Sequence, residues 1–498
     1  MKKLSCLVIF LFTLSSCSLG TDYREIASNT DESKIQVYMS PTQGKQAFNK
    51  MYKMIKNAEK EVNITIYSWS DKGFTKALRE TLERKNPPQV RVVMRKSVFK
   101  KHAKTIAELE KKGAMFKSAK IELHEKFILV DGHSLVNSSA NMSAGAKNKY
   151  SENFIFFDSR DESDKSDIKS ILKDFKQEFA IIWNNAHDYI TPNEKMTADV
   201  LNHKIKRSNK MSTLKDIFLV SSSMNYRMVS PSKKDFNKGS NLGLKRMPNK
   251  KNQVWRVRDV LIKAIQNAKK SIELNINHFN IRQISDELIE AVKRGVDVKI
   301  AVDSQEFKTF INNKEMTPQF VKDYKKLKGK SSIAPVRIKF YSFVPHHTSW
   351  SLNHHKSILI DYDPNDTSDT VLITGSYNYS KTAEHSKFDN QVVIKGNLYK
   401  NVYEAFNNEF NYLWFLERTE SDEVKKEHIS FFTKGRSGLI PLHTNKPFSL
   451  IWGEAVNLKR RIAKLHPESR TFFKFKHCQY FSPTKKIFLK RNSKTICE

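Results

Sequence analysis

The chain has 498 residues, with 87 Lys and Arg against 53 Asp and Glu, which gives a formal net charge of +34. A hydrophobic content of 39% with 11% aromatic residues is too high for a disordered chain, and 15 Gly and 14 Pro exclude collagen-like or low-complexity architecture. The basic surplus predicts a polyanionic partner: nucleic acid, an anionic membrane or a phosphorylated substrate. Charge alone does not choose among these three.

The N-terminus has the pattern of an export signal. Lys2 and Lys3 precede an apolar run, residues 4–14, that is too short to span a bilayer, so residues 1–16 are predicted to be a signal peptide. Residues 14–17, Leu-Ser-Ser-Cys, resemble the lipobox of bacterial lipoproteins. The resemblance implies that Cys17 is lipidated and is the first mature residue, and that the protein is a membrane-anchored lipoprotein facing the periplasm or the cell surface. An ordinary cleaved signal with an incidental cysteine is the alternative.

The sequence after the signal contains an internal repeat. Residues 55–66 recur as residues 265–276, and each copy reads as the end of an amphipathic helix that runs into a strand with alternating apolar positions. A second helix follows, at 75–84 and 285–294, and then a second strand, at 89–94 and 296–302. Upstream, the segment 37–41 ending in Ser-Pro is echoed by 227–231. Alternating strands and helices in both copies predict an α/β sandwich unit built twice, with pseudo-two-fold symmetry.

The repeat sets the expected boundaries. We expect the first unit at residues 35–190, a basic linker at 191–223, the second unit at 224–418, and a basic C-terminal extension at 419–498. Each unit ends in an apolar stripe typical of a core-facing helix. The stripe residues are Phe175, Phe179 and Trp183 in the first unit, and Phe406, Phe410 and Trp414 in the second.

The last 58 residues are rich in cations and aromatic residues. Residues 441–498 contain 13 Lys and Arg against three Glu. A solvated extension and a binding segment for lipid or stacked bases are both compatible with this composition. Cys478 and Cys497 could form a disulfide in an oxidising compartment.

Both units contain His-x-Lys, and four residues separate the lysine from an aspartate that follows it. These residues are His124, Lys126 and Asp131 in the first unit, and His354, Lys356 and Asp361 in the second. Because side chains alternate along a strand, the histidine and lysine share one face, and the intervening Glu125 and His355 point the other way. Asp131 and Asp361 come at the strand end, so we interpret them as turn residues, with direct catalysis as the alternative.

A small polar cluster and then an acid follow each of these motifs. The clusters contribute Ser139 and Asn141 in the first unit and Ser376 and Asn378 in the second, and the acids are Glu152 and Asp389. Histidine, lysine, hydroxyl and amide groups from two units would form a pocket rich in hydrogen-bond donors. Such a pocket suits a phosphodiester, whose non-bridging oxygens accept from cations and neutral donors. Histidine adds a nucleophile or proton donor that works near neutral pH.

At these residues the chain resembles the phospholipase D superfamily, with two HKD motifs in one polypeptide. The first unit departs from the family pattern in Ser138, where glycine is usual, and in residues 86–88, Asn-Pro-Pro, where the second unit has Arg-Gly-Val. Both departures concern turns. The duplication within one chain predicts a monomer that carries both halves of one active site.

The resemblance implies a role for each site residue. His124 is expected to attack phosphorus and form a phosphohistidine, and His354 to act as general acid and base, although the sequence permits the reverse. The two lysines and the asparagines at 141 and 378 would hold the phosphoryl oxygens, supported by the serines at 139 and 376. Glu152 would orient His354, and Asp389 would orient His124. No metal or other cofactor is implied, and we interpret His346, His347 and His355 as loop or back-of-strand residues.

Two substrate classes remain open at this point. A phospholipase D or cardiolipin synthase-like enzyme would act on phospholipid, and acyl tethering would place it at its substrate. An exported nuclease of the same superfamily would use the basic charge to hold DNA or RNA. The tandem motifs and the lipobox favour phospholipid. A non-catalytic binder of anionic membrane or nucleic acid is the weakest interpretation, because both motifs are complete.

Overall fold

The computed structural model describes residues 34–188, 199–201, 215–247, 256–277, 279–303, 316–330, 332, 334–339 and 352–415. The expected signal peptide, the C-terminal extension, Cys17, Cys478, Cys497, His346 and His347 lie outside the described residues. Within the described part, no helix is both long enough and apolar enough to span a bilayer.

The first unit contains five helices and nine strands. In chain order these are β1 (Ile35–Ser40), α1 (Gly44–Lys56), β2 (Glu61–Ile66), α2 (Lys72–Leu82), β3 (Gln89–Met94), α3 (Lys96–Lys111), β4 (Met115–Ser118), β5 (Glu122–Leu123), β6 (Phe127–Val130), β7 (Ser134–Ser138), α4 (Ala144–Asn148), β8 (Glu152–Asp158), α5 (Asp167–Asn185) and β9 (His187–Asp188).

The second unit repeats this order with an added hairpin. Its described elements are β10 (Ile217–Ser221), η1 (Ser222–Asn225), β11 (Tyr226–Val229), α6 (Lys233–Phe236), β12 (Gly243–Arg246), α7 (Arg256–Asn267), β13 (Ser271–Ile276), α8 (Arg282–Lys293), β14 (Asp297–Asp303), α9 (Thr317–Lys328), β15 (Val336–Lys339), β16 (Lys356–Ile360), β17 (Val371–Gly375), α10 (Lys381–Ser386), β18 (Lys387–Phe388), β19 (Asn390–Lys395), η3 (Asn397–Tyr399) and α11 (Lys400–Phe415).

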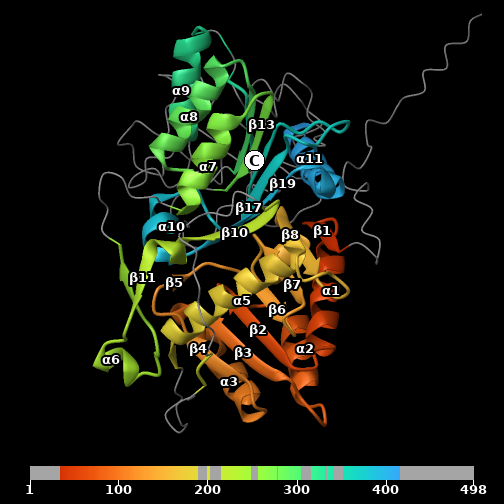
Figure 1. Ribbon diagram of the computed structural model, residues 1–498, viewed down its shortest axis with the longest axis vertical. Coiled ribbons are helices and arrows are strands. Elements are labelled where there is room, and N and C mark those ends of the chain that lie inside the picture. The colour runs from red at the N-terminus through yellow and green to blue at the C-terminus, as the bar shows by residue number, and fades with distance from the viewer. Residues whose placement is uncertain are drawn as a thin grey trace, which may run out of the picture.

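Each unit is built on one mixed sheet, and the two sheets have equivalent strand orders. The first runs β1-β8-β7-β6-β2-β3-β4-β9 and the second β10-β19-β17-β16-β13-β14-β15. In both, three successive strands are parallel to one another (β2, β3 and β4; β13, β14 and β15), and β6 and β16 pair antiparallel with the first of these. This confirms the prediction of two similar α/β units in one chain. Figure 1 shows the first unit below and the second above.

Three apolar clusters hold the layers together. One cluster packs α1, α2 and α3 against the first sheet, and another packs α7, α8 and α9 against the second. The third lies between the sheets and contains residues of both units, including Phe175, Phe179, Trp183 and Phe406. Here α5 of the first unit contacts β10 of the second, and α11 of the second contacts β1 of the first. The predicted helix stripes are therefore core residues, and part of that core is shared between the units.

The start of the second unit differs from the prediction. The strand equivalent to β1 is β10, which pairs with β19 as β1 pairs with β8. It lies within the segment 191–223 that we expected to be a linker. Residues 226–229, which the Ser-Pro echo had suggested as this first strand, form β11 instead and pair with β12. The short Ser-Pro resemblance was misleading because it repeats a turn and not the buried strand before it.

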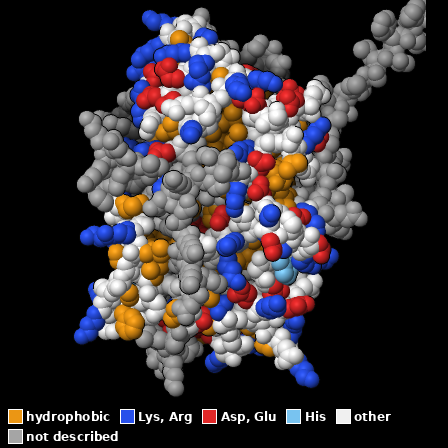
Figure 2. Space-filling view, viewed as in Figure 1, with side chains coloured by type: hydrophobic (Ala, Val, Ile, Leu, Met, Phe, Trp, Pro, Cys, Tyr) orange, Lys and Arg blue, Asp and Glu red, His pale blue; other side chains and the backbone are white. Residues whose placement is uncertain are grey.

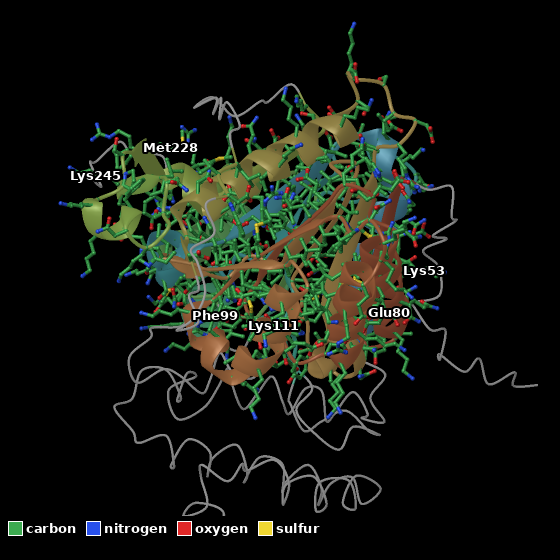
Figure 3. The ribbon with its side chains drawn as sticks, turned by 90° about the horizontal axis from the view of Figure 1, so that it is seen from below. Lys53, Glu80, Phe99, Lys111, Met228 and Lys245 are labelled. Atoms are coloured by element: carbon green, nitrogen blue, oxygen red, sulfur yellow. The ribbon has the colours of Figure 1, made fainter. Side chains whose placement is uncertain are left out.

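The β11–β12 hairpin links the second unit to the first. Asp235 in α6 accepts from Lys120 and lies 2.9 Å from His187 Nε2, and both of these residues belong to the first unit. Figure 3 shows Met228 and Lys245 of this hairpin on one side of the molecule, with Lys53 and Glu80 of α1 and α2 on the other.

Asp131 and Asp361 are turn residues at the end of the strands that follow the His-x-Lys motifs. Both have left-handed backbone conformations, with φ of 52° and 53°. The Asp131 carboxylate accepts from the backbone N–H groups of residues 59–61 at 2.7–2.9 Å. The Asp361 carboxylate accepts from residues 269–271 at 2.6–3.1 Å. Each aspartate thus connects its hairpin by hydrogen bonds to the start of the neighbouring strand, β2 or β13. It lies at the end of β6 or β16 that is far from the histidine.

Substitution of Asp131 is expected to lower stability. Asp131→Ala removes an acceptor shared by three N–H groups, so we expect the free energy of unfolding to fall by about 2 kcal/mol. Denaturant unfolding followed by circular dichroism measures this. Asp161→Ala is the matched control, because Asp161 also has positive φ (64°) and its side chain is exposed. Equal losses in the two variants would show that backbone strain, and not hydrogen bonding, causes the effect.

Candidate active site

The histidine of each unit is attached through its backbone to the other unit. The His124 N–H donates to the carbonyl of Phe388 at 2.9 Å, beside the parallel pairing of β5 with β18. The His354 N–H donates to the carbonyl of Ser151 at 2.9 Å. In both cases the acceptor is the residue directly before the acid of the other unit, Asp389 or Glu152. The backbone hydrogen bond therefore brings the acid close to the histidine.

The side chains complete two reciprocal pairs. His124 Nδ1 lies 2.6 Å from Asp389 Oδ1, and His354 Nδ1 lies 2.8 Å from Glu152 Oε1. A carboxylate beside Nδ1 favours the tautomer in which that nitrogen carries the hydrogen. The remaining ring nitrogen, Nε2, then has its lone pair available for the pocket.

Lysine and serine residues surround these pairs. The ammonium groups of Lys126 and Lys356 donate to the carbonyls of His124 and His354, the latter at 2.5 Å. The hydroxyl groups at positions 139 and 376 donate to Glu152 and Asp389 at 2.7 and 2.9 Å. Each serine thereby fixes the acid that faces the opposite histidine.

The two candidate phosphate-binding amides lie just beyond the serines. Asn141 follows β7 and Asn378 follows β17, at equivalent positions. In both, Oδ1 is buried and has no hydrogen-bond partner among the described residues. The structure therefore assembles the predicted histidines, lysines, serines and acids, with the asparagines adjacent, and keeps Asp131 and Asp361 away from them.

Burial controls the ionisation of the histidines. It lowers the pKa of His124 well below the usual value, and the charges of Lys126, Lys387 and Lys356 lower it further. Burial also lowers the pKa of His354, to about 4, although Glu152 partly opposes this. Without a bound anion, both rings are therefore neutral at pH 7.

The acids and lysines are shifted unequally. Burial raises the pKa of Asp389 to about 7, partly offset by Lys126 and the Ser376 hydroxyl. Burial would also raise the pKa of Glu152, but His354 and Lys356 outweigh it and the pKa is lowered. Burial lowers the pKa of Lys126 to about 8 and that of Lys356 to about 7. The two halves of the site are therefore alike in geometry but different in charge.

The residue between each histidine and lysine points to the back of the sheet, as predicted. His355 is fully buried there, with Nδ1 3.0 Å from the Asn153 amide and Nε2 3.1 Å from Glu409 in α11. Asn153 directly follows Glu152, so two adjacent residues of the first unit contact two adjacent residues of the second, on opposite faces. This double contact holds the acid in register with the histidine.

In the first unit, the residue between the histidine and the lysine is Glu125, and it belongs to a pair of buried carboxyl groups behind the sheet. Glu125 lies beside Glu178 of α5, and both contact the Ser221 hydroxyl, at 3.3 and 2.8 Å. Burial and then the neighbouring Glu178 raise the pKa of Glu125 well above its usual value. Sequence reasoning missed Glu178 and Glu409. The sequence did contain a signal for them: in both helix stripes a glutamate directly precedes the second aromatic residue, Phe179 or Phe410.

The chemistry of the donor set fits an anion better than a cation. No group of three or more His, Cys, Asp or Glu side chains suited to a metal ion occurs in the part of the chain that the structure describes. The pocket offers two imidazoles, two ammonium groups and two amides from equivalent positions of the two units. Such a set can hold phosphoryl oxygens while one imidazole attacks and the other transfers a proton.

The ionisation of the two histidines can be measured directly. Because burial lowers both pKa values, we expect the imidazoles of His124 and His354 to be neutral at pH 6 in the ligand-free protein. Nitrogen-15 NMR of histidine-labelled protein reports this, with signals assigned by His124→Gln and His354→Gln. A doubly protonated ring at pH 6 for either residue would contradict the expectation.

Comparisons with known proteins agree with this geometry. The family model described as "Cardiolipin synthase, PLD-like domain" matches residues 51–183 and 261–414. The mitochondrial cardiolipin hydrolase of Danio rerio is 26% identical over 140 residues, which are 28% of this chain and 57% of that protein. The chain thus spans little more than half the length of this relative.

Two solved structures are also similar. Phosphatidylserine synthase of Haemophilus influenzae has a TM-score of 0.50 and 12% identity, covering 82% of this chain and 95% of its own. Nuc of Salmonella typhimurium, a phospholipase D family member, has a TM-score of 0.27 and 22% identity, covering 32% of this chain and 98% of its own. The first likeness concerns the fold. Because the family model covers more than half of the chain, in both units, the protein belongs to the phospholipase D superfamily, in the family of cardiolipin synthase PLD-like domains.

Proposed function

We propose that the protein is a phospholipase D-type phosphodiesterase or phosphatidyltransferase that acts on phospholipid. The observation that carries this proposal is the pair of reciprocal contacts, His124 with Asp389 and His354 with Glu152, in one pocket lined by two lysines. A phosphodiesterase of this superfamily needs one nucleophile and one proton donor on opposite sides of phosphorus. The arrangement supplies both.

In the first step, Nε2 of His124 attacks phosphorus and forms a P–N bond. The P–O bond to the leaving alcohol breaks, its electron pair stays on oxygen, and His354 donates the proton. The anionic substrate raises the pKa of the buried His354 ring, so that it is protonated when it is needed. Glu152 stabilises the resulting imidazolium, and Lys126 and Lys356 balance the charge on the phosphoryl oxygens.

In the second step, His354 removes a proton from water or an alcohol. The activated oxygen attacks phosphorus, the P–N bond breaks, and its electron pair returns to His124. Asp389 keeps Nδ1 of His124 protonated, so that Nε2 is regenerated as the nucleophile. Water gives hydrolysis, and an alcohol gives transfer.

Phospholipid is favoured as the substrate by three observations. The matching family model is described by cardiolipin synthase, the relative from Danio rerio is a cardiolipin hydrolase, and the N-terminus resembles a lipobox. We further propose that Cys17 anchors the exported protein to a membrane. The anchor would confine the site to the surface that holds its substrate.

A nuclease is the second candidate, and one observation favours it. The net charge of +34 far exceeds what the site lysines need, and Figure 2 shows Lys and Arg side chains spread over both units on this face. A dispersed basic surface suits a long polyanion.

A diesterase assay tests the proposal. The chain lacking residues 1–16 should hydrolyse bis(4-nitrophenyl) phosphate in the presence of EDTA, because the two histidines supply the chemistry. We expect His124→Ala to reduce kcat by about 10³-fold or more. His133→Ala is the control, since this histidine lies beside Ser134 at the far end of the strand. Full activity in His124→Ala would show that the pocket is wrongly assigned.

The same preparation distinguishes the two substrate classes. It is offered vesicles of phosphatidylglycerol and phosphatidylethanolamine, and separately plasmid DNA. Release of a headgroup or formation of a transfer product supports the phospholipid proposal. Degraded DNA with unchanged lipid supports the nuclease instead.

The pocket should bind a diester more weakly as pH rises. Lys356, with a pKa of about 7, loses its charge above neutrality, and Asp389, also about 7, gains a negative charge over the same range. We expect KM for bis(4-nitrophenyl) phosphate, which stays a monoanion, to rise about tenfold between pH 6 and 8. Lys356→Arg keeps its charge and should flatten this rise. A constant KM in the original protein would contradict the assignment.

A further inference from the structure

The catalytic groups are symmetric between the units, but the residues that flank them are not. Three positions are compared: the residue after the first parallel strand, the residue that follows the last paired residue of the second strand (Met94 or Val302), and the residue two before the acid. Around His124 these residues are Tyr67 and Arg95 of the first unit and Lys387 of the second. Around His354 the equivalent residues are Asn277 and Asp303 of the second unit and Tyr150 of the first.

The first set surrounds His124. The Tyr67 ring packs edge-on against the His124 ring, with centroids 4.9 Å apart. The Arg95 guanidinium lies over the same tyrosine, 4.6 Å from its centroid, and donates to its hydroxyl. Arg95 is therefore one aromatic ring away from the expected nucleophile.

Lys387 reaches the same wall from the second unit. It lies opposite Glu122 in the parallel pair formed by β5 and β18. Alternation along these strands places Glu122 on the face of His124, and Lys387 on the face of Asp389. Glu122 lies 2.5 Å from Arg95 Nε, and the two side chains are about one-third exposed. This side of the site is thus partly open to solvent and carries two cations and one carboxylate.

The opposite wall has the reverse charge. Asp303 is fully buried, and its Oδ2 accepts from the backbone N–H of Asn353 at 2.7 Å. Tyr150 replaces the lysine and Asn277 replaces the tyrosine. An anionic substituent on the substrate is therefore attracted to the His124 side and repelled from the His354 side.

We propose that Arg95 and Lys387 bind a second phosphate group of the substrate, beside the one that reacts. This rests on the proposed phosphodiesterase function and narrows its substrate to diesters that carry a further phosphate. A guanidinium has five N–H donors, so contacts with Glu122 and Tyr67 leave donors for a phosphate. Lipids that contain two phosphate groups and polynucleotides both carry such a second phosphate. Arg95 and Lys387 are specificity residues and touch no reacting atom.

Binding of small probes tests the second-phosphate site without turnover. Isothermal titration calorimetry compares propane-1,3-diol bisphosphate with propyl phosphate on the full chain. We expect the bisphosphate to bind at least about tenfold more tightly. Arg95→Gln and Lys387→Tyr, which introduces the residue of the other unit, should each remove most of this ratio, and propyl phosphate binding should stay the same in Arg95→Gln. Arg282→Gln, an exposed arginine in α8, is the control for general charge and should keep the ratio.

Several outcomes would overturn the proposal. Equal affinity for the two probes in the original protein would do so, and so would a ratio that survives in the Arg95→Gln, Lys387→Tyr double variant. Loss of propyl phosphate binding in step with the bisphosphate would show a structural role. If the ratio behaves as expected but no diester is hydrolysed, the phosphodiesterase function fails and the phosphate site stands.

Substrate pairs identify the source of the second phosphate. Vesicles of cardiolipin are compared with phosphatidylglycerol, and the dinucleotide pTpT is compared with TpT, by kcat/KM. A preference for cardiolipin that collapses in Arg95→Gln identifies a lipid source, and the same behaviour with pTpT identifies nucleic acid. No preference in either pair contradicts the proposal.

Discussion

The structure depends on one constraint: each histidine must meet an acid from the other unit. Neither unit contains a complete pair, so the site exists only where the two units touch. The shared apolar cluster makes this contact permanent, because α5 packs against β10 and α11 packs against β1. Separating the units would expose the apolar side chains of this cluster that contact the other unit, which costs about 25 cal/mol for each Å² of apolar surface. The apolar contact that stabilises the molecule thus also assembles the site.

The register of this contact is fixed from both faces of the sheet. In front, Glu152 contacts His354; behind, the next residue, Asn153, contacts His355. A shift of one residue along the strand would bring the wrong face of each chain to the interface and leave these buried polar groups unpaired. The polar groups behind the sheet therefore help to fix the position of Glu152 relative to His354, since apolar packing alone would tolerate small shifts.

Much of the fold and the site could be predicted from the sequence, for identifiable reasons. The period of two in residues 124–126 predicts which side chains share a face, and the duplicated motif predicts two units. The pairing of acid and histidine across units came from the resemblance, because no local pattern encodes a contact between residues 265 positions apart. Strand β10 was missed because its short apolar run follows a lysine-rich stretch. Glu178 and Glu409 were missed because helical periodicity describes only the apolar face.

The difference between the two halves has a physical origin in the reaction. A phosphodiester has two different ester groups, and in the proposed reaction the two histidines act in opposite protonation states. The groups that contact phosphorus cannot differ much, since both halves hold equivalent oxygens. Asymmetry can therefore arise only around them, in the flanking positions and behind the sheet. That is where Arg95 of the first unit corresponds to Asp303 of the second, and where the Glu125 carboxyl replaces the His355 imidazole. Under the proposed function, these differences would orient an unsymmetrical substrate in a nearly symmetrical site.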